Sequence, residues 1–227
     1  MKLTSIQSTR LTAVIFLLFL SAIIYYFSAT EADIPKMTVQ EKKTRFRALI
    51  VPAVNDVYDE LMSQYKKVSA SIDSGKYSNQ IETLKTEYKV TSNEALLMAL
   101  KPHPKSIAIA QAAIESAWAT SRFFNEANNI FGVWSFTEDE PRIAALQKRG
   151  DKTIWLKKYS SVKAAVRDYY RTLGRSSAFK EFRALRMQSN DPFLLVTKLD
   201  RYSEKGAEYG DELSSIIKFN QFDLYDR

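Results

Sequence analysis

The chain has 227 residues, of which 45% are hydrophobic and 26% are charged, and it contains no Cys and a single His. This composition is typical of a folded protein, and it excludes both a disulfide framework and a zinc site of Cys and His ligands. His103 lies between two prolines, an unfavourable place for the base of a Ser-His-Asp triad. We therefore predict no metal and no cofactor. The formal net charge of +7 favours anionic partners, but the chain has no recognisable nucleic-acid motif.

The first predicted element is an apolar run over residues 11–29, which carries no charged side chain. As a helix this run would extend about 28 Å, close to the hydrocarbon thickness of a bilayer. Residues 1–30 are therefore predicted to be an N-terminal membrane anchor that forms a transmembrane helix. A cleaved signal segment, cut after Ala32, is the alternative and would release a secreted protein.

The charges that flank this run favour no single orientation. Lys2 and Arg10 precede it and favour a cytoplasmic N-terminus, but five basic residues follow its other end: Lys36, Lys42, Lys43, Arg45 and Arg47. We expect a single-pass protein of the cytoplasmic membrane with an extracytoplasmic, periplasmic domain. The substrate inferred below, which lies outside the cytoplasm, decides that orientation.

Residues 37–72 are predicted to form a helix that is broken or kinked near Pro52. Apolar residues recur in it at three- and four-residue spacing and predict one buried stripe: Phe46, Ile50, Val54, Val57 and Leu61. Its basic residues are expected to form a solvated face: Lys42, Lys43, Arg45 and Arg47. Short helices are predicted at 78–88 and 93–100. Residues 31–90 would then be a helical arm, and 91–227 a separate domain.

Within 91–227, Pro104 is expected to open a helix that runs to about Trp118. Residues 121–135 are predicted as a loop that leads into a short strand, and 154–159 as a second strand, with a small β-lobe between them. Further helices are predicted from Ser161 through Leu173, at 192–199 and at about 207–219. The expected fold class is mainly α within the α+β class, a helical domain with a small β-lobe beside one helix end.

One carboxylate stands out in this pattern. Glu115 is the only charged residue between Ser106 and Thr120, a helical segment rich in Ala. A carboxyl group in such surroundings is partly desolvated, and desolvation raises its pKa. A general acid that works near neutral pH needs that shift. Exposure of Glu115 to solvent, or pairing with a Lys, is the alternative.

The residues around Glu115 resemble a known family. The segment AIAQAAIESAWATSRFFNEANNIFGVW at 108–134 is similar to the signature of bacterial glucosaminidases that cut peptidoglycan, within the lysozyme-like group, and most of all to their Bax-like branch. The helix with its Glu, the TSRF stretch and the NN-FG turn follow at the expected spacing. Two later segments extend the likeness to residues 100–222: KKYSSVKAAVRDYYRTL and YSEKGAEYGDELSSII.

The resemblance implies a glucosaminidase-like catalytic domain over 91–227 and a role for several residues. Glu115 matches the catalytic Glu of the family. Two further sets match the turn beside it and the far wall of the cleft: Asn128, Asn129, Phe131 and Gly132 in the turn, Tyr202 and Tyr209 in the wall. The sequence departs from the family at Ala117 and Ala119, where Gly is usual, which puts activity on the usual substrate in doubt.

A second acidic group is expected in the β-lobe, where the family has one. Glu138 and Glu140 lie two positions apart, so on an extended strand they would share a face and Asp139 would point away. A solvated turn before Pro141 is the alternative. The acetamido group of the substrate could also replace a second carboxylate. Trp134 is predicted to stack on a sugar ring, whereas Trp118 and Trp155 are expected to pack internally.

These observations predict a peptidoglycan hydrolase that cleaves the N-acetylglucosaminyl β-1,4 glycosidic bond, with Glu115 as its general acid. The expected partners are peptidoglycan glycan strands and, through the N-terminal helix, the membrane. Two alternatives remain: a lytic transglycosylase, which also starts from one Glu on a helix, and a wall-binding module that has lost catalysis.

Overall fold

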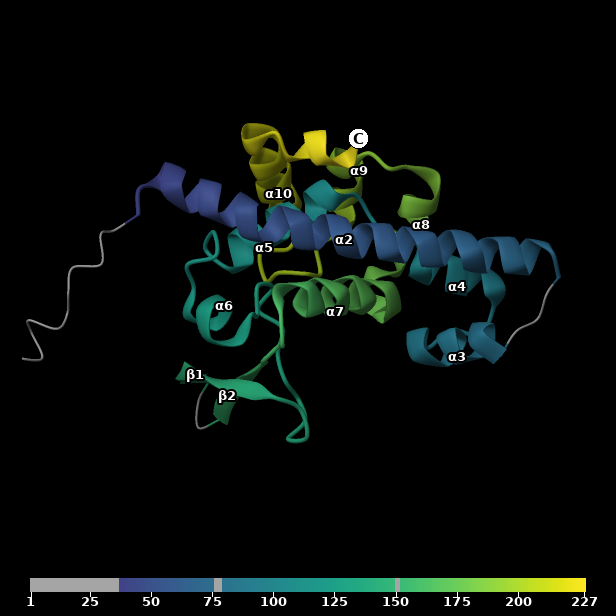
Figure 1. Ribbon diagram of the computed structural model, residues 1–227, viewed down its shortest axis with the longest axis horizontal. Coiled ribbons are helices and arrows are strands. Elements are labelled where there is room, and N and C mark those ends of the chain that lie inside the picture. Colours follow the sequence, from purple (N-terminus) through teal and green to yellow (C-terminus); the bar gives the residue numbers. More distant parts are fainter. Residues whose placement is uncertain (1–36, 76–78, 150–151) are drawn as a thin grey trace, which may run out of the picture. The chain divides into compact units, whose positions relative to one another are not determined.

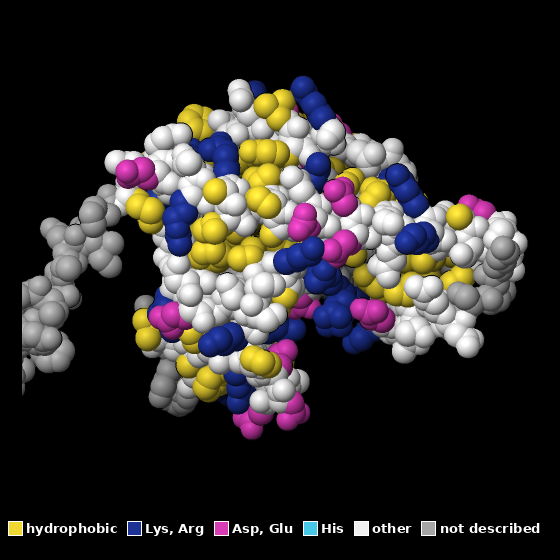
Figure 2. Space-filling model, viewed as in Figure 1, with side chains coloured by type: hydrophobic (Ala, Val, Ile, Leu, Met, Phe, Trp, Pro, Cys, Tyr) yellow, Lys and Arg dark blue, Asp and Glu magenta, His cyan; other side chains and the backbone are white. Residues whose placement is uncertain are grey.

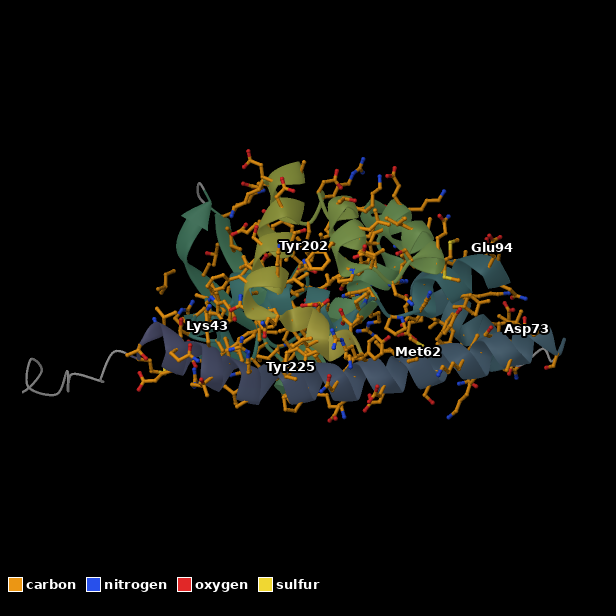
Figure 3. The ribbon with its side chains drawn as sticks, turned by 90° about the horizontal axis from the view of Figure 1, so that it is seen from above. Lys43, Met62, Asp73, Glu94, Tyr202 and Tyr225 are labelled. Atoms are coloured by element: carbon orange, nitrogen blue, oxygen red, sulfur yellow. The ribbon has the colours of Figure 1, made fainter. Side chains whose placement is uncertain are left out.

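Helix α2 (Val39–Asp73) runs across the middle of the view in Figure 1, which shows the computed structural model and describes residues 37–75, 79–149 and 152–227. Residues Gln40–Arg227 form one compact unit. The apolar stripe predicted for α2 is confirmed, since four of its members are fully buried in the main core: Phe46, Ile50, Val54 and Val57. The view from above shows Lys43, Met62 and Asp73 following one another along this helix (Figure 3).

The predicted break near Pro52 is wrong, because α2 continues through that residue. A proline inside a helix removes one backbone hydrogen bond and costs about 3 kcal/mol. Pro52 is exposed, so its ring lies on the solvent side of α2. Ile50 and Val54, buried on either side of it, hold the helix against the core and offset the cost.

The sequence predicted a solvated face for the basic residues at the start of α2, but Arg45 and Lys43 contact other parts of the fold. Arg45 Nη1 donates a hydrogen bond to the carbonyl of Ala119 over 2.8 Å. Lys43 Nζ donates to Asn220 Oδ1 over 2.8 Å and lies 4.8 Å from the centre of the Trp118 ring. Long cationic side chains can pack their stems while their charged ends find acceptors. These residues therefore tie α2 to the segment that follows Glu115.

Helices α3 (Asn79–Tyr88) and α4 (Asn93–Leu100) confirm the two short helices predicted there. They build a second, smaller core with the far end of α2, made of Val68, Ile81, Leu84, Tyr88, Leu96, Ala99 and Leu100. Helix α7 (Val162–Arg175) packs against α4 at Gly174. A Cβ at Gly174 would lie 2.7 Å from the Ala99 carbonyl oxygen, so this close approach requires glycine.

Helix α5 (Lys105–Glu115) lies at the centre of the fold and contacts helix α10 (Ala207–Asn220) and the 3-10 helix η3 (Phe222–Asp226). Its first turn is fixed by Asp226, which accepts hydrogen bonds from the backbone N and the hydroxyl of Ser106. The predicted end at Trp118 is wrong. The helix ends at Glu115 because the backbone turns left-handed from residue 117 onward.

The β-lobe is an antiparallel pair, β1 (Arg142–Arg149) and β2 (Lys152–Lys157), in which Arg142 pairs with Lys157 and Ile143 with Leu156. The register shifts between Ala144 and Lys148. A short strand before β1 is present only as a single bridge between Trp134 and Leu156. Residues 138–140 form a bend, so the assumption that they lie on an extended strand is wrong.

The remaining elements are α10 and several short helices. The predicted helices at 192–199 and 207–219 correspond to α9 (Pro192–Leu195) with η2 (Val196–Lys198) and to α10. The sequence missed α6 (Arg122–Ala127), η1 (Ser177–Phe179) and α8 (Lys180–Gln188). The described part of the chain is thus mainly helical with a small two-stranded sheet, as expected.

The predicted span at 11–29 lies outside the described residues. Across 37–75, 79–149 and 152–227, no helix combines the length and apolar character needed to cross a membrane.

Candidate active site

Glu115 occupies the last position of α5, where it is partly buried. All residues of α5 from Ser106 to Ala113 are buried. Burial raises the pKa of the Glu115 carboxyl; its hydrogen bond with Tyr209 lowers it, and nearby Glu212 raises it further, so the net shift is upward. The C-terminal end of a helix carries partial negative charge, which also disfavours a carboxylate there. Glu115 therefore keeps its proton to higher pH than an ordinary Glu.

Tyr209 and Gly132 flank the Glu115 carboxyl group. The Tyr209 hydroxyl from α10 donates a hydrogen bond to Oε1 over 2.9 Å. On the other side lies Gly132, at which an added Cβ would be 3.9 Å from Oε2. Gly132 also has a positive φ of 64°, which favours glycine. The carboxyl group is therefore fixed on one oxygen and faces bare backbone on the other.

Directly after Glu115 the backbone adopts a left-handed conformation at three successive residues, Ala117, Trp118 and Ala119, with φ of 50°, 62° and 60°. Ser116 stabilises this run, because its hydroxyl donates to the Ala112 carbonyl over 2.6 Å and accepts from the Ala119 N–H over 2.8 Å. Positive φ costs an L-residue roughly 1–2 kcal/mol and glycine almost nothing. The two departures from the family's glycines thus fall where the backbone favours glycine.

We expect Ala117→Gly to stabilise the protein by about 1 kcal/mol, raising its Tm by about 2–4 °C, because Ala117 is exposed and glycine relieves its strained φ. Ala119→Gly is the matched control. Its methyl group is fully buried, and the loss of about 0.8 kcal/mol of burial should offset most of the gain. Thermal unfolding of both variants measures this; a lower Tm for Ala117→Gly would contradict it.

The two asparagines of the NN-FG turn hold the backbone rather than point at Glu115. Asn128, in a left-handed conformation at the end of α6, donates to the Tyr159 carbonyl over 3.0 Å. The buried Asn129 amide donates to the carbonyls of Val133 and Lys157 over 2.9 and 2.8 Å and accepts from the Val133 N–H. These bonds dock the turn on β2.

Phe131 fixes the turn to α7. It is buried, and its ring stacks on Tyr169 of α7 at 4.0 Å with an interplanar angle of 9°. Among the residues predicted for the turn, Gly132 is the one that faces the carboxyl group of Glu115. Asn128, Asn129 and Phe131 position it.

Tyr202 and Tyr209 lie on the opposite side of the carboxyl group. Their rings stack at 5.5 Å with an interplanar angle of 4°. Tyr202 lies between α10 and the neighbouring helices, in the middle of the side chains seen from above (Figure 3). Burial, followed by the charge of Glu115, raises the pKa of each hydroxyl. Both tyrosines are therefore neutral and can donate hydrogen bonds near Glu115.

The β-lobe presents exposed aromatic rings. Trp134 is 43% exposed and lies 6.3 Å from Phe136, which is 84% exposed. Phe136 was missed in the sequence, although an exposed aromatic beside Trp134 is a signal for carbohydrate stacking. Trp118 packs on Phe46 at 5.2 Å, and Trp155 lies under the Arg142 guanidinium at 4.3 Å.

The acidic stretch at 138–140 is tied to cations of the β-lobe. Glu138 pairs with Arg142 over 2.9 Å, and its side chain is 88% exposed. Glu140 pairs with Lys157 over 3.4 Å, and its side chain is 30% exposed. Glu140 also lines a hollow of about 340 Å³ together with Tyr159 and Asp168. The structure therefore distinguishes the two glutamates by their surroundings.

A larger hollow of about 590 Å³ lies between α2, α3 and α7, and Glu115 does not line it. Lys and Arg side chains gather at this face (Figure 2). Its arginines are already paired, Arg167 with Glu60 over 2.5 Å and Arg171 with Glu87 over 3.2 Å. We assign no ligand to it.

A mainly helical domain with a small β-lobe and one desolvated carboxylic acid at a helix end has the arrangement of a lysozyme-like glycoside hydrolase. Residues 91–222, more than half of the chain, match the family described as mannosyl-glycoprotein endo-beta-N-acetylglucosaminidase, or Glucosaminidase. The chain belongs to this family. The resemblance found in its sequence is confirmed.

Two curated relatives are similar in sequence. Protein bax of Escherichia coli strain K12 is 31% identical over 124 residues, 52% of this chain and 43% of that protein. Exo-glucosaminidase LytG of Bacillus subtilis strain 168 is 26% identical over 167 residues, 70% of this chain and 59% of that protein. The chain therefore spans about half the length of the curated relatives it matches.

A solved structure has a similar fold. The catalytic domain of the autolysin Auto from Listeria monocytogenes superimposes with a TM-score of 0.50 at 17% identity. The match covers 89% of this chain and 96% of that one. It includes more of the chain than the family match at 91–222, so the similarity of fold extends beyond the signature around Glu115.

Proposed function

We propose that this glycoside hydrolase acts on peptidoglycan and cleaves its N-acetylglucosaminyl β-1,4 bond, with Glu115 as general acid. The observation that carries the proposal is the partly buried carboxyl group at the end of α5, whose pKa is raised by burial. The family match and the name of the exo-glucosaminidase relative support the sugar specificity. The sequence signature at 108–134 supports the polymer.

In this mechanism Glu115 protonates the leaving glycosidic oxygen as the sugar gains oxocarbenium character. The Tyr209 hydroxyl then stabilises the carboxylate that remains, through the bond already made to Oε1. Trp134 and Phe136 offer apolar ring faces on which sugar rings can stack. Tyr202, stacked on Tyr209, keeps that donor in place.

For the second group we favour Glu140 over Glu138, because Glu140 is held by Lys157 in a hollow whereas Glu138 points to solvent. We expect Glu140→Gln to lower the rate at least tenfold more than Glu138→Gln does, as measured on purified peptidoglycan. Asp139→Asn serves as the control for charge alone. Equal, small losses in all three variants would reject these three carboxylates as the second group and fit a solvated turn. Tight binding of a thiazoline-type inhibitor would then support the acetamido group of the substrate.

Mass spectrometry of peptidoglycan digested by the purified protein tests the proposed function. Cleavage at the predicted bond produces a new reducing end on N-acetylglucosamine. A lytic transglycosylase leaves an anhydro sugar and no new reducing end, which would reject hydrolysis. Binding to peptidoglycan without any soluble product would show a wall-binding module instead.

We further propose that residues 11–29 anchor the protein in the cytoplasmic membrane with the catalytic domain on the periplasmic side. The apolar run and the extracytoplasmic position of the substrate support this topology. A reporter that is active only in the periplasm should be active when fused after Arg227. Activity of a cytoplasmic-only reporter at the same position would reject both the topology and the substrate.

A further inference from the structure

A line of buried side chains connects Glu115 with His103, the single histidine of the sequence. Behind the bond from Tyr209 to Glu115, Gln111 Nε2 donates to the Tyr209 hydroxyl oxygen over 3.1 Å. Gln111 Oε1 accepts from the Tyr169 hydroxyl over 2.5 Å. The Tyr169 oxygen lies 2.9 Å from His103 Nε2. Four hydrogen bonds thus join five side chains from α5, α7, α10 and the segment before α5.

The direction of this chain is determined at each step, because a hydroxyl has one hydrogen and an amide has one donor end. Tyr209 donates to a carboxylate, so it accepts from Gln111. Gln111 then turns its oxygen to Tyr169, and Tyr169 accepts from His103. The ionised form of Glu115 is therefore matched to His103 with its proton on Nε2.

Protonated Glu115 fits the same direction. General acid catalysis places the proton on Oε2, the oxygen that does not bind Tyr209, and Oε1 is then a carbonyl oxygen that still accepts from Tyr209. Gln111, Tyr169 and the Nε2–H tautomer of His103 therefore keep their roles in both protonation states of Glu115.

The surroundings of His103 keep its ring neutral. The ring is fully buried, and burial followed by the charge of Arg186 holds its pKa well below the ordinary range. Tyr170 stacks on it at 4.4 Å, and Phe182 lies at 5.4 Å. Nδ1 is buried without a hydrogen-bond partner among the described residues. Because an N–H there would lack an acceptor, the Nε2–H form is favoured in isolation.

Other charged and titratable groups lie near the Glu115 end of the chain. Glu212 of α10 and Lys205 before α10 act on Glu115 from a distance, with opposite effects, and Tyr202 lies beside it. Within the described residues, Tyr209 is the side chain that makes a hydrogen bond to Glu115. Coupling from Glu115 into the protein interior therefore runs through Tyr209.

We propose that the Nε2–H tautomer of His103 sets the direction of this chain, which makes His103, Tyr169 and Gln111 positioning residues for the Glu115 carboxyl group. The catalytic meaning of the chain rests on the proposed function. Since the Nε2–H tautomer points every donor toward Glu115, the chain stabilises the carboxylate left when Glu115 gives its proton to the leaving oxygen.

The direct test is nitrogen NMR of the full-length protein in detergent, with ¹⁵N in the His ring. The single histidine makes its signals unambiguous. The ring should show the Nε2–H pattern both above and below the titration of Glu115, which is followed by the carboxyl carbon signal that is absent from Glu115→Gln. The Nδ1–H pattern, or imidazolium, on either side of that titration overturns the proposal.

Two variants test the chain. Tyr170→Phe is the matched control, because it keeps the ring stacked on His103 and its hydroxyl makes only a 3.4 Å bond to the His103 carbonyl. It should leave the titration midpoint of Glu115 unchanged. Tyr169→Phe frees the Gln111 amide to draw the Tyr209 hydroxyl away from Glu115.

The loss of that hydrogen bond raises the pKa of Glu115. In the pH dependence of the hydrolysis rate, Tyr169→Phe should therefore move the alkaline limb to higher pH by as much as about one unit. Tyr170→Phe should leave this limb unchanged. A purely structural role of Tyr169 would lower stability without moving the limb, which counts against the proposal. Wild-type protein without any hydrolysis would reject the proposed function, while the NMR result would still decide the tautomer of His103 and so the direction of the chain.

Discussion

Glu115→Gln is expected to lower the rate of peptidoglycan hydrolysis by at least about 10²–10⁴-fold, the usual contribution of general acid catalysis. The amide has nearly the same shape as the carboxylic acid but cannot give up a proton to the leaving oxygen. Turbidity loss of a peptidoglycan suspension measures the rate. A variant that kept more than about a tenth of the wild-type rate would rule out Glu115 as the acid.

The stability of the same variant provides a second measurement. Burial raises the folded-state pKa of Glu115 above its unfolded value, so folding favours the protonated form and stability falls as pH rises through that interval. Glu115→Gln removes this penalty, and we expect it to be at least as stable as the wild type at neutral pH. Glu126→Gln, at a half-exposed glutamate paired with Arg122 on α6, is the control and should change neither rate nor stability.

The features that the sequence predicted correctly are local ones. The stripe of α2 follows from residues spaced three and four apart, and Ser161 at the start of α7 accepts a hydrogen bond from the Ala164 N–H, as a helix cap should. The isolation of Glu115 among alanines likewise predicted its burial and its raised pKa. In each case the deciding interaction lies within one or two helical turns.

The features that were missed depend on residues far apart in the chain. Ala117 and Ala119 are good helix formers, so nothing local predicts that the helix ends at Glu115; Arg45, 74 residues before Ala119, binds the left-handed run. The bond between Gln111 and Tyr209 spans 98 residues. Periodicity cannot reveal such pairs, because they exist only after α5 and α10 have packed together.

Asp168 carries the largest expected effect on stability. Its buried side chain on α7 accepts hydrogen bonds from Tyr159, Arg171 and Lys157 over 2.8, 3.0 and 3.2 Å, and so fastens the β-lobe to the helical core. Removing one partner of a buried charged group leaves the others unsatisfied. We expect Asp168→Ala to lower the free energy of unfolding by about 2–4 kcal/mol, measured by urea denaturation at pH 7.

The pH dependence distinguishes this network from surface charge. Burial raises the pKa of Asp168, but its bonds with Arg171, Tyr159 and Lys157 outweigh burial and hold that pKa below the ordinary value. A lowered carboxyl pKa stabilises the fold above the unfolded-state pKa, and this stabilisation is lost as pH falls through the folded-state value. The difference in free energy of unfolding between wild type and Asp168→Ala should therefore shrink in acid.

Glu60→Ala is the control, because Glu60 also binds α7, through Lys163 and Arg167, but is about half exposed. It should cost less than about 1 kcal/mol, and an equal loss in both variants would show that burial of Asp168 adds nothing.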